Sequence, residues 1–233
     1  MRWPGADGSA DPAAPAVRRD VACASPLVRP FARWMLRREA AALAAIAGMH
    51  AGPARDGLPR LLHAGRDVLV RTWLDGHALH EGRPADPAWF GAARRLLVAL
   101  HRAGITHNDT AKEANWLVRA DGGPALVDFQ LAWLAPRRSA PRGGRGGRGG
   151  HERRRARRGR LFRLLAREDL RHLAKHKRTC CPHALTPRER ALLADPSCPA
   201  RWLRAGPKRL YNLVTRRLLG WADDEGARRR RNP

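Results

Sequence analysis

The sequence predicts an α+β fold in which short strands and one helix come first and longer helices follow. The chain has 233 residues, which is long enough for one large domain or two small lobes around a real core. Strand-like and helix-like apolar patterns alternate up to residue 76, and two further short strands flank a turn before residue 128. Beyond Asp128 every element that the sequence predicts is a helix.

The first two elements are a strand and a helix. The run "AVRRDVACA" at 16–24 predicts a strand, after a Pro-, Gly- and Ala-rich start at 1–15 that is expected to fray. After Pro30, "FARWMLRREAAALAAIAGM" predicts a helix that stops at Gly48. Its inward side chains are expected to be those near helical spacing, namely Trp34, Leu36, Leu43 and Ile46.

A hairpin and a longer helix follow. The stretch "LPRLLHAGRDVLVRTWLDG" at 58–76 predicts two strands around the turn Gly65-Arg66-Asp67. Asp86 can cap the next helix, and Pro87 suits its first position. Gly104 is expected to end that helix in the left-handed conformation. The inward stripe of the helix is predicted to contain Phe90, Ala93, Leu97 and Leu100.

The stretch "GITHNDTAKEANWLV" at 104–118 gathers polar residues between a helix end and a strand start. The runs "NWLV" and "PALVDF" flank Asp121-Gly122-Gly123, which predicts a second hairpin. The polar loop is therefore held at both ends, and such loops commonly carry function. An ordinary Asx-rich turn is the alternative interpretation of the loop on its own.

The carboxyl-terminal part contains a low-complexity stretch and three predicted helices. Residues 138–158, with "RGGRGGRGG" and "HERRRARR", are expected to form a flexible insertion. Helical signals resume at 159–177, and Thr186 with Glu189 predicts a capping box. A last helix is expected over 207–219.

Composition leaves several classes of partner open. The formal net charge is +25, and only four of the 46 basic residues are Lys. This excess fits contact with phosphates, nucleic acid or anionic membranes, and it also fits the coding bias of a GC-rich genome. No apolar run is long enough to span a membrane and no secretory signal is evident, so a cytoplasmic protein with reduced cysteines is expected. A zinc site at "CCPH" is disfavoured, because adjacent cysteines ligate one ion poorly.

Four side chains of the loop and hairpin suit phosphoryl transfer. Asn115 and Asp128 lie at the two ends of the predicted hairpin, so their oxygens should be close together. Hard oxygen donors of this kind suit Mg²⁺, which usually takes few protein ligands together with substrate phosphates. Asp109 is then free to accept a proton from an attacking hydroxyl, and Lys112 can neutralise charge on the phosphate.

The segment "HNDTAKEANWLV…PALVDFQLAW" resembles the catalytic loop and metal-binding motif of the protein-kinase-like superfamily, in wording closest to its bacterial RIO and lipopolysaccharide (Kdo) kinase branch. The resemblance covers residues 16–221 apart from the Arg/Gly stretch. It implies a catalytic base at Asp109, a loop-supporting His107, and Mg²⁺ ligands at Asn115 and Asp128.

The resemblance also implies a nucleotide-binding pair. Glu39 matches the glutamate that pairs with a strand lysine, and Arg19, or alternatively Arg18, occupies the lysine position. Asp169 corresponds to a carboxylate that braces the catalytic loop. The sequence departs from the family pattern at several places. Asn115 lies one residue further along than is common, Gln130 replaces a glycine, and no Gly-rich loop precedes Arg19.

The resemblance implies a two-lobed fold with a reduced strand-rich N-lobe at 1–76 and a helical C-lobe at 77–233. It implies ATP and Mg²⁺ as cofactors and a hydroxyl acceptor, most simply a protein serine or threonine. A lipopolysaccharide sugar acceptor, an inactive pseudokinase scaffold and a nucleic-acid binder acting through the Arg/Gly tract stay open as alternatives. The tract contains no Phe or Tyr, so it offers no platform on which bases could stack.

Overall fold

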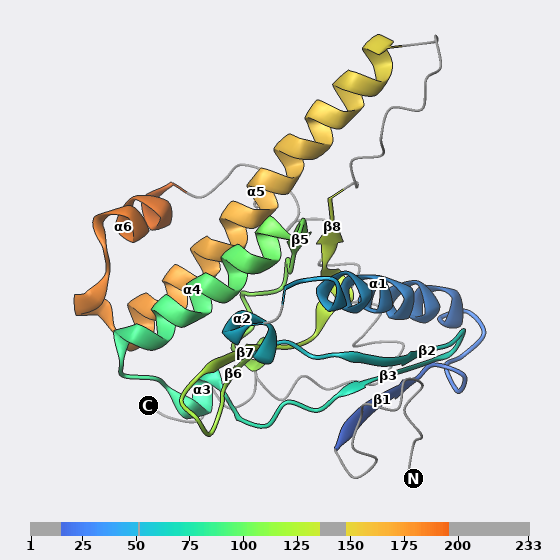
Figure 1. The fold of residues 1–233 in the computed structure, drawn as a ribbon, viewed down its shortest axis with the longest axis horizontal. Helices are drawn as coiled ribbons and strands as arrows, with labels where there is room; N and C mark the ends of the chain where they lie inside the picture. The colour runs from blue at the N-terminus through green and yellow to red at the C-terminus, as the bar shows by residue number, and fades with distance from the viewer. Residues whose placement is uncertain (1–14, 51, 136–147, 196–233) are drawn as a thin grey trace.

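The computed structural model describes residues 15–50, 52–135 and 148–195. This part of the chain contains helices and small antiparallel sheets, which confirms the predicted α+β class. Figure 1 shows one helix lying along a three-stranded sheet and two further helices packed side by side beyond it. Among the described residues no helix is long and apolar enough to cross a membrane.

The three-stranded sheet is built from both strand segments that the sequence predicts near its beginning. Its order is β1-β3-β2 and all pairs are antiparallel. A tight turn joins β2 to β3, closed by a 2.7 Å hydrogen bond from the N–H of Gly65 to the carbonyl of Val68. The N–H of Val21, just after β1, donates to the carbonyl of Asp67 at 2.8 Å and ties β1 to this turn. The strands are β1 (Ala16–Asp20), β2 (Leu61–Ala64) and β3 (Val68–Thr72).

Helix α1 (Arg29–Ala47) lies along this sheet and ends at Gly48, as predicted. Its buried stripe differs from the prediction at one position, because Trp34 is 46% exposed and stacks on Phe31. The buried side chains of α1 follow the helical spacing and include Met35 and Glu39. Met35 is one residue after Trp34 and therefore points roughly 100° away from it around the helix. Trp34 lies two residues before the buried Leu36, which is about 200° around the helix, so the two side chains cannot share one face.

The second hairpin forms as predicted. Strands β6 (Trp116–Val118) and β7 (Pro124–Leu126) pair antiparallel, and β4 (His77–Ala78) adds to the other edge of β6. Gly122 takes a φ of 74° in the turn, a conformation that favours glycine. The hairpin therefore brings the residues that precede β6 and follow β7 to one end.

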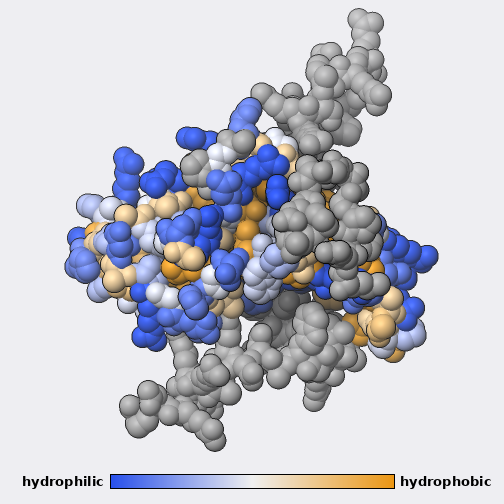
Figure 2. Space-filling model, turned by 60° about the horizontal axis from the view of Figure 1, so that its bottom comes forward, coloured by the Kyte–Doolittle hydropathy of each residue, from blue (hydrophilic) through white to orange (hydrophobic). Residues whose placement is uncertain are grey.

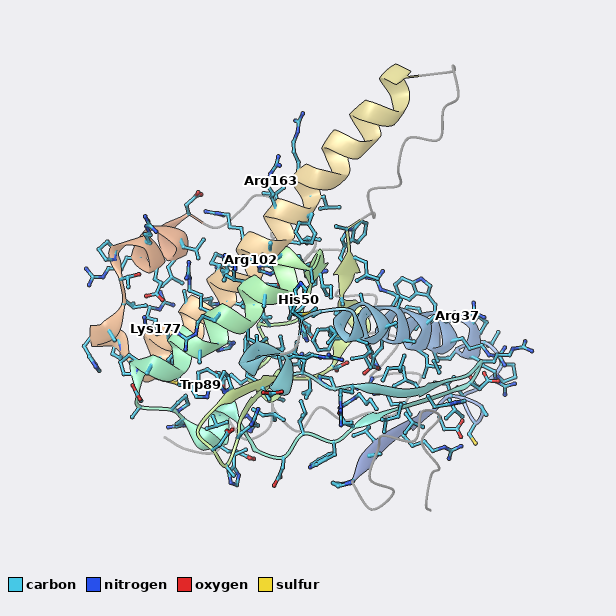
Figure 3. All side chains as sticks on the ribbon, viewed as in Figure 1. Arg37, His50, Trp89, Arg102, Arg163 and Lys177 are labelled. Carbon is cyan, nitrogen blue, oxygen red and sulfur yellow. The ribbon has the colours of Figure 1, made fainter. Side chains whose placement is uncertain are left out.

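Helix α4 (Pro87–Arg102) has the ends that the sequence predicts. Asp86 accepts a hydrogen bond from the N–H of Ala88 at 2.8 Å, and Gly104 follows the helix with a φ of 79°. The four predicted inward residues are buried, and Trp89 packs edge-on against Trp116 of β6 (Figure 3). This packing joins α4 to the hairpin that carries the candidate site.

Helix α5 (Arg148–Cys180) packs beside α4 and begins earlier than the sequence suggested (Figure 1). Residues 148–158, expected to belong to a flexible insertion, form its first turns, whereas 138–147 lies outside the described residues. Arg and Ala are both strong helix formers, so a low-complexity run of them can extend a helix. Low complexity was therefore a poor guide to local structure here.

The chain after α5 contains the predicted capping box. Helix α6 (Pro187–Ala194) begins at Thr186, whose hydroxyl accepts from the N–H of Glu189, while the Glu189 carboxylate accepts from Thr186. Lys177 of α5 donates to Glu189 at 2.9 Å, which ties the two helices together (Figure 3). Cys181, between these helices, is buried in the core, and the helix predicted at 207–219 lies outside the described residues.

The remaining elements are short. Strands β5 (Ile105–Thr106) and β8 (Trp133–Leu134) pair antiparallel, which corrects the expectation that only helices follow Asp128. Their pairing anchors the chain on both sides of the polar loop. The other short elements are α2 (Pro53–Asp56), α3 (Leu79–Gly82), η1 (Glu113–Asn115), η2 (Phe129–Leu131) and η3 (Pro182–Ala184).

Hydrophilic side chains cover much of the surface. Figure 2 shows hydrophobic residues of one face in separate groups among hydrophilic ones. Four large hydrophobic side chains of the described residues are exposed, namely Leu27, Trp34, Trp73 and Leu134. Scattered exposure of this kind is normal for globular proteins.

Candidate functional site

The polar loop lies between β5 and η1, and its backbone is fixed by a carboxylate of α5. Asp169 is fully buried and accepts 2.9 Å hydrogen bonds from the backbone N–H groups of His107 and Asn108. His101 of α4 lies 3.1 Å from the same carboxylate. Asn108 itself has a φ of 64°, a conformation that Asn tolerates better than most residues. The bracing contact predicted for Asp169 is present.

His107 joins the loop to the chain after β7. Its Nε2 lies 2.9 Å from the carbonyl oxygen of Val127, and its Nδ1 accepts from the N–H of Asp109 at 3.3 Å. The ring is fully buried and packs edge-on against Phe129. These contacts fit the tautomer with hydrogen on Nε2, and they give His107 a supporting role for the loop backbone.

Asp109 is held from two sides. Its side chain is buried, and Lys112 places Nζ 3.0 Å from Oδ2. The side-chain amide of Asn115 donates to the same Oδ2 at 3.1 Å and to the Asp109 carbonyl at 2.9 Å. The structure therefore brings together three residues that the sequence singled out. Both side-chain contacts use Oδ2, so Oδ1 takes part in neither.

Asn115 and Asp128 come from the two ends of the hairpin, as predicted. The N–H of Val127, next to Asp128, donates to the carbonyl of Asn115 at 2.9 Å. Asp128 has a φ of 67°, whereas Gln130 lies inside η2 and needs no left-handed backbone. Gln130 therefore fits its position without backbone strain, because the left-handed conformation is taken by Asp128.

A second group of charges, the Glu39 cluster, consists of Glu39, Arg19, Arg71 and Asp128. Arg19 reaches both acids, with Nη1 3.3 Å from Glu39 Oε2 and Nη2 3.4 Å from Asp128 Oδ1. Arg71 places Nε 3.4 Å from Glu39 Oε1. Arg18 instead pairs with Asp20 at the surface, so of the two alternatives it is Arg19 that meets Glu39.

The carboxylate of Glu39 is fully buried. Burial raises the pKa of Glu39 above its ordinary value, partly offset by the positive charges of Arg19 and Arg71. Burial likewise lowers the pKa of Arg71 below its ordinary value. Within the described residues neither oxygen of Glu39 has a hydrogen-bond partner, so ion pairing alone compensates this charge.

Sequence reasoning missed Arg71. The residue lies on β3 in phase with the buried Leu69, because side chains two apart in a strand share a face. In the register of the sheet Arg71 is opposite Val17 and Leu69 is opposite Arg19. A charged residue at an inward position of "VLVRT" was the signal that could have revealed it.

The oxygens at the hairpin end suit a magnesium ion. Asp128 Oδ1 is buried without a hydrogen-bond partner among the described residues, and both hydrogen bonds of the Asn115 side chain use its NH₂ group. Among these residues no three His, Cys, Asp or Glu side chains form a metal-binding group. Mg²⁺ commonly takes only one or two protein carboxylates together with waters and substrate phosphates. The oxygens of Asn115 and Asp128 therefore fit a Mg²⁺ ion that takes few protein ligands.

No family model and no curated protein matches the chain. Its structural neighbours include WbdD. A co-crystal structure of WbdD with the kinase inhibitor LY294002 is 20% identical, with a TM-score of 0.40, and the match covers 51% of this chain and 29% of that one. A structure of monomeric WbdD is 19% identical, with a TM-score of 0.42, over 77% of this chain and 37% of that one. The chain thus spans well under half the length of these WbdD chains.

Proposed function

We propose that this protein is an ATP-dependent phosphotransferase that moves the γ-phosphate of ATP to a hydroxyl group. The observation that carries the proposal is the position of Asp109, buried and held between Lys112 and Asn115. The hairpin joins Asn115 in turn to the segment that holds Asp128. Asp109, which would accept the proton, therefore lies in one continuous segment with the cation Lys112 and the two proposed metal ligands, Asn115 and Asp128.

Asp109 would accept the proton of the attacking hydroxyl. The contacts from Lys112 and Asn115 fix Oδ2, and the brace of Asp169 fixes the loop backbone, so the carboxylate is oriented before substrate arrives. Lys112 would neutralise negative charge on the transferring phosphate. In this role Lys112 would exchange part of its contact with Asp109 for the phosphate.

Asn115 and Asp128 would hold Mg²⁺ through the amide oxygen and the carboxylate. Bound there, the ion would supply positive charge to the phosphates of ATP. Arg19, which forms an ion pair with Glu39 in the structure, would contact the same phosphates. Arginine keeps the charge of the lysine that the family pattern has at this position, and its planar fork suits phosphate oxygens.

The proposal includes a two-lobed arrangement. Residues 1–76 would form a reduced strand-rich N-lobe and residues 77–233 a helical C-lobe, with ATP between them and the acceptor against the helical part. The acceptor we propose is a serine or threonine hydroxyl of a protein, and the alternative is a sugar hydroxyl of a lipopolysaccharide precursor. An inactive scaffold would bind nucleotide without turnover.

The test of activity is transfer of label from ATP labelled in its γ-phosphate, measured with Mg²⁺ and two acceptor pools. One pool is a set of Ser/Thr peptides and the other is Kdo-containing lipopolysaccharide precursors. We expect label in one pool, and a loss of about 10²- to 10⁴-fold in rate for Asp109→Asn because the variant cannot accept the proton. Asparagine has the same shape, so the loop should keep its fold.

The matched control is Asp121→Asn, the same chemical change in the exposed turn of the hairpin. This variant should transfer label at the wild-type rate. Equal rates for Asp109→Asn and the wild type would remove Asp109 from the chemistry. Binding of MgATP without transfer to either pool would favour the scaffold.

A further inference from the structure

The Glu39 cluster contains two arginines and two carboxylates, and both arginines contact Glu39. Arg19 contacts one oxygen of Glu39 and Arg71 contacts the other, at 3.3 and 3.4 Å. A buried carboxylate that loses all its partners is strongly unfavourable, so at least one cation must stay with Glu39. Only one of the two arginines can therefore leave Glu39 for another partner.

The two arginines differ in how firmly they are held. The Arg71 side chain is 9% exposed and that of Arg19 is 23% exposed. The ion pairs of the two arginines are equally long, at 3.3 to 3.4 Å, but Arg71 also donates from Nη1 to the backbone carbonyl of Thr72 at 3.3 Å. Arg71 is thus the fixed partner of Glu39, and Arg19 is the more adjustable one.

Arg19 also occupies Asp128, the carboxylate proposed to hold the metal. Its Nη2 lies 3.4 Å from Asp128 Oδ1, so binding of a divalent cation to this oxygen would compete with the guanidinium. Arg19 can leave Asp128 and turn to phosphate only if Glu39 remains compensated. Arg71 is placed to provide that compensation.

We propose that Arg71 is a positioning residue that neutralises Glu39 and so frees Arg19 to bind the phosphates of a nucleoside triphosphate when Asp128 takes up its metal. This inference deepens the proposed function and rests on it. In the structure Arg19 bridges Glu39 and Asp128. In the loaded protein Arg71 alone would hold Glu39, and Arg19 would face the phosphates.

A double-mutant cycle on MgATP affinity tests the inference. The four proteins are the wild type, Arg71→Met, Glu39→Gln and the double variant, with dissociation constants measured by calorimetric titration. Methionine keeps much of the length of the side chain without its charge. Arg71→Met should weaken MgATP binding on the order of tenfold when Glu39 is present, because Arg19 must then stay with the carboxylate.

In the Glu39→Gln background the same Arg71→Met change should alter the affinity by less than about twofold, because no buried charge needs compensation. Arg71→Lys, which keeps the charge, should lie closer to the wild type than Arg71→Met. Far-ultraviolet circular dichroism and urea unfolding establish that each variant is folded before titration.

The outcomes separate the inference from the proposed function. A wild type that does not bind MgATP contradicts both. Binding by the wild type with an equal loss for Arg71→Met in both backgrounds overturns the role of Arg71 while the proposed function stands. The same holds if Arg71→Met binds MgATP as tightly as the wild type does.

Discussion

The Asp109 loop, residues 107–115, and the Glu39 cluster are two polar parts of one candidate site, and they are built differently. In the loop, backbone and side-chain groups are hydrogen-bonded, including two N–H groups 2.9 Å from Asp169. In the cluster, four charged groups meet through ion pairs of 3.3 to 3.4 Å. Among the described residues neither oxygen of Glu39 has a hydrogen-bond partner.

The difference matches the two tasks that we propose. A proton acceptor must be held in one orientation, because a small displacement reduces the rate steeply. A group that exchanges partners when nucleotide arrives must instead be able to move. The contacts of Asp109 with Lys112 and Asn115 are 2.9 to 3.1 Å long, and the ion pairs of Arg19 are 3.3 to 3.4 Å long.

Replacing the brace of the loop should have the largest effect on stability. Asp169→Ala would leave the buried N–H groups of His107 and Asn108 without their acceptor, so we expect a loss of about 3 kcal/mol in the free energy of unfolding. Urea unfolding measures it. The control is Asp195→Ala at the end of α6, an exposed carboxylate expected to change stability by less than about 0.5 kcal/mol. Equal losses in the two variants would show that Asp169 does not brace the loop.

The Glu39 cluster should respond less strongly, because it has two cations. Arg19→Met should lower the free energy of unfolding by about 1 to 2 kcal/mol, less than full loss of a buried pair, since Arg71 still compensates Glu39. The neighbouring Arg18→Met removes an exposed ion pair and should change stability by less than about 0.5 kcal/mol. Equal losses in the free energy of unfolding for Arg19→Met and Arg18→Met would show that Arg19 does not compensate Glu39.

Acid should weaken the support behind the loop. Burial, with a smaller contribution from Arg171, lowers the pKa of His172 to about 4. Thr110 of the loop places Oγ1 3.5 Å from His172 Nδ1. The fold holds this histidine neutral, whereas the unfolded chain takes up a proton below about pH 6.5. The stabilisation is therefore complete above that pH and is lost as pH falls toward 4.

Between pH 7 and pH 5 we expect the wild type to lose roughly 1 to 2 kcal/mol of stability through His172. His172→Gln should flatten this part of the pH profile, whereas the same change at the exposed His183 should not. Burial lowers the pKa of His176 in the same direction, so some dependence on pH should remain in the variant. An unchanged profile in His172→Gln would remove this histidine as the cause.

The parts of the fold that the sequence predicted depend on local chemistry. Asp86 and Gly104 mark the two ends of α4, the Asp121-Gly122-Gly123 turn forms the second hairpin, and Thr186 begins α6 with its capping box. Each signal lies within a few residues of the structure that it determines. The closeness of Asn115 to Val127, the residue before Asp128, followed from the hairpin alone.

The parts that were missed depend on contacts distant in sequence. Pairing of β5 with β8 joins strands separated by a whole hairpin, and the burial of Arg71 depends on α1 covering β3. Trp34 was expected inside from its spacing, yet the buried stripe runs through Met35 and Leu36. The two-lobed arrangement and the roles of the site residues stay predictions.

If Asp128 helps to bind MgATP, the nucleotide should raise the melting temperature of the wild type, and thermal unfolding with and without MgATP measures this. Asp128→Asn is the variant to compare, because Asn tolerates the φ of 67° better than Ala. At a hundredfold excess over the dissociation constant, MgATP should stabilise the wild type by about 2.7 kcal/mol. We predict a raised melting temperature that requires Mg²⁺ and is lost in Asp128→Asn. No shift at millimolar MgATP, or an equal shift in the variant, would contradict the account.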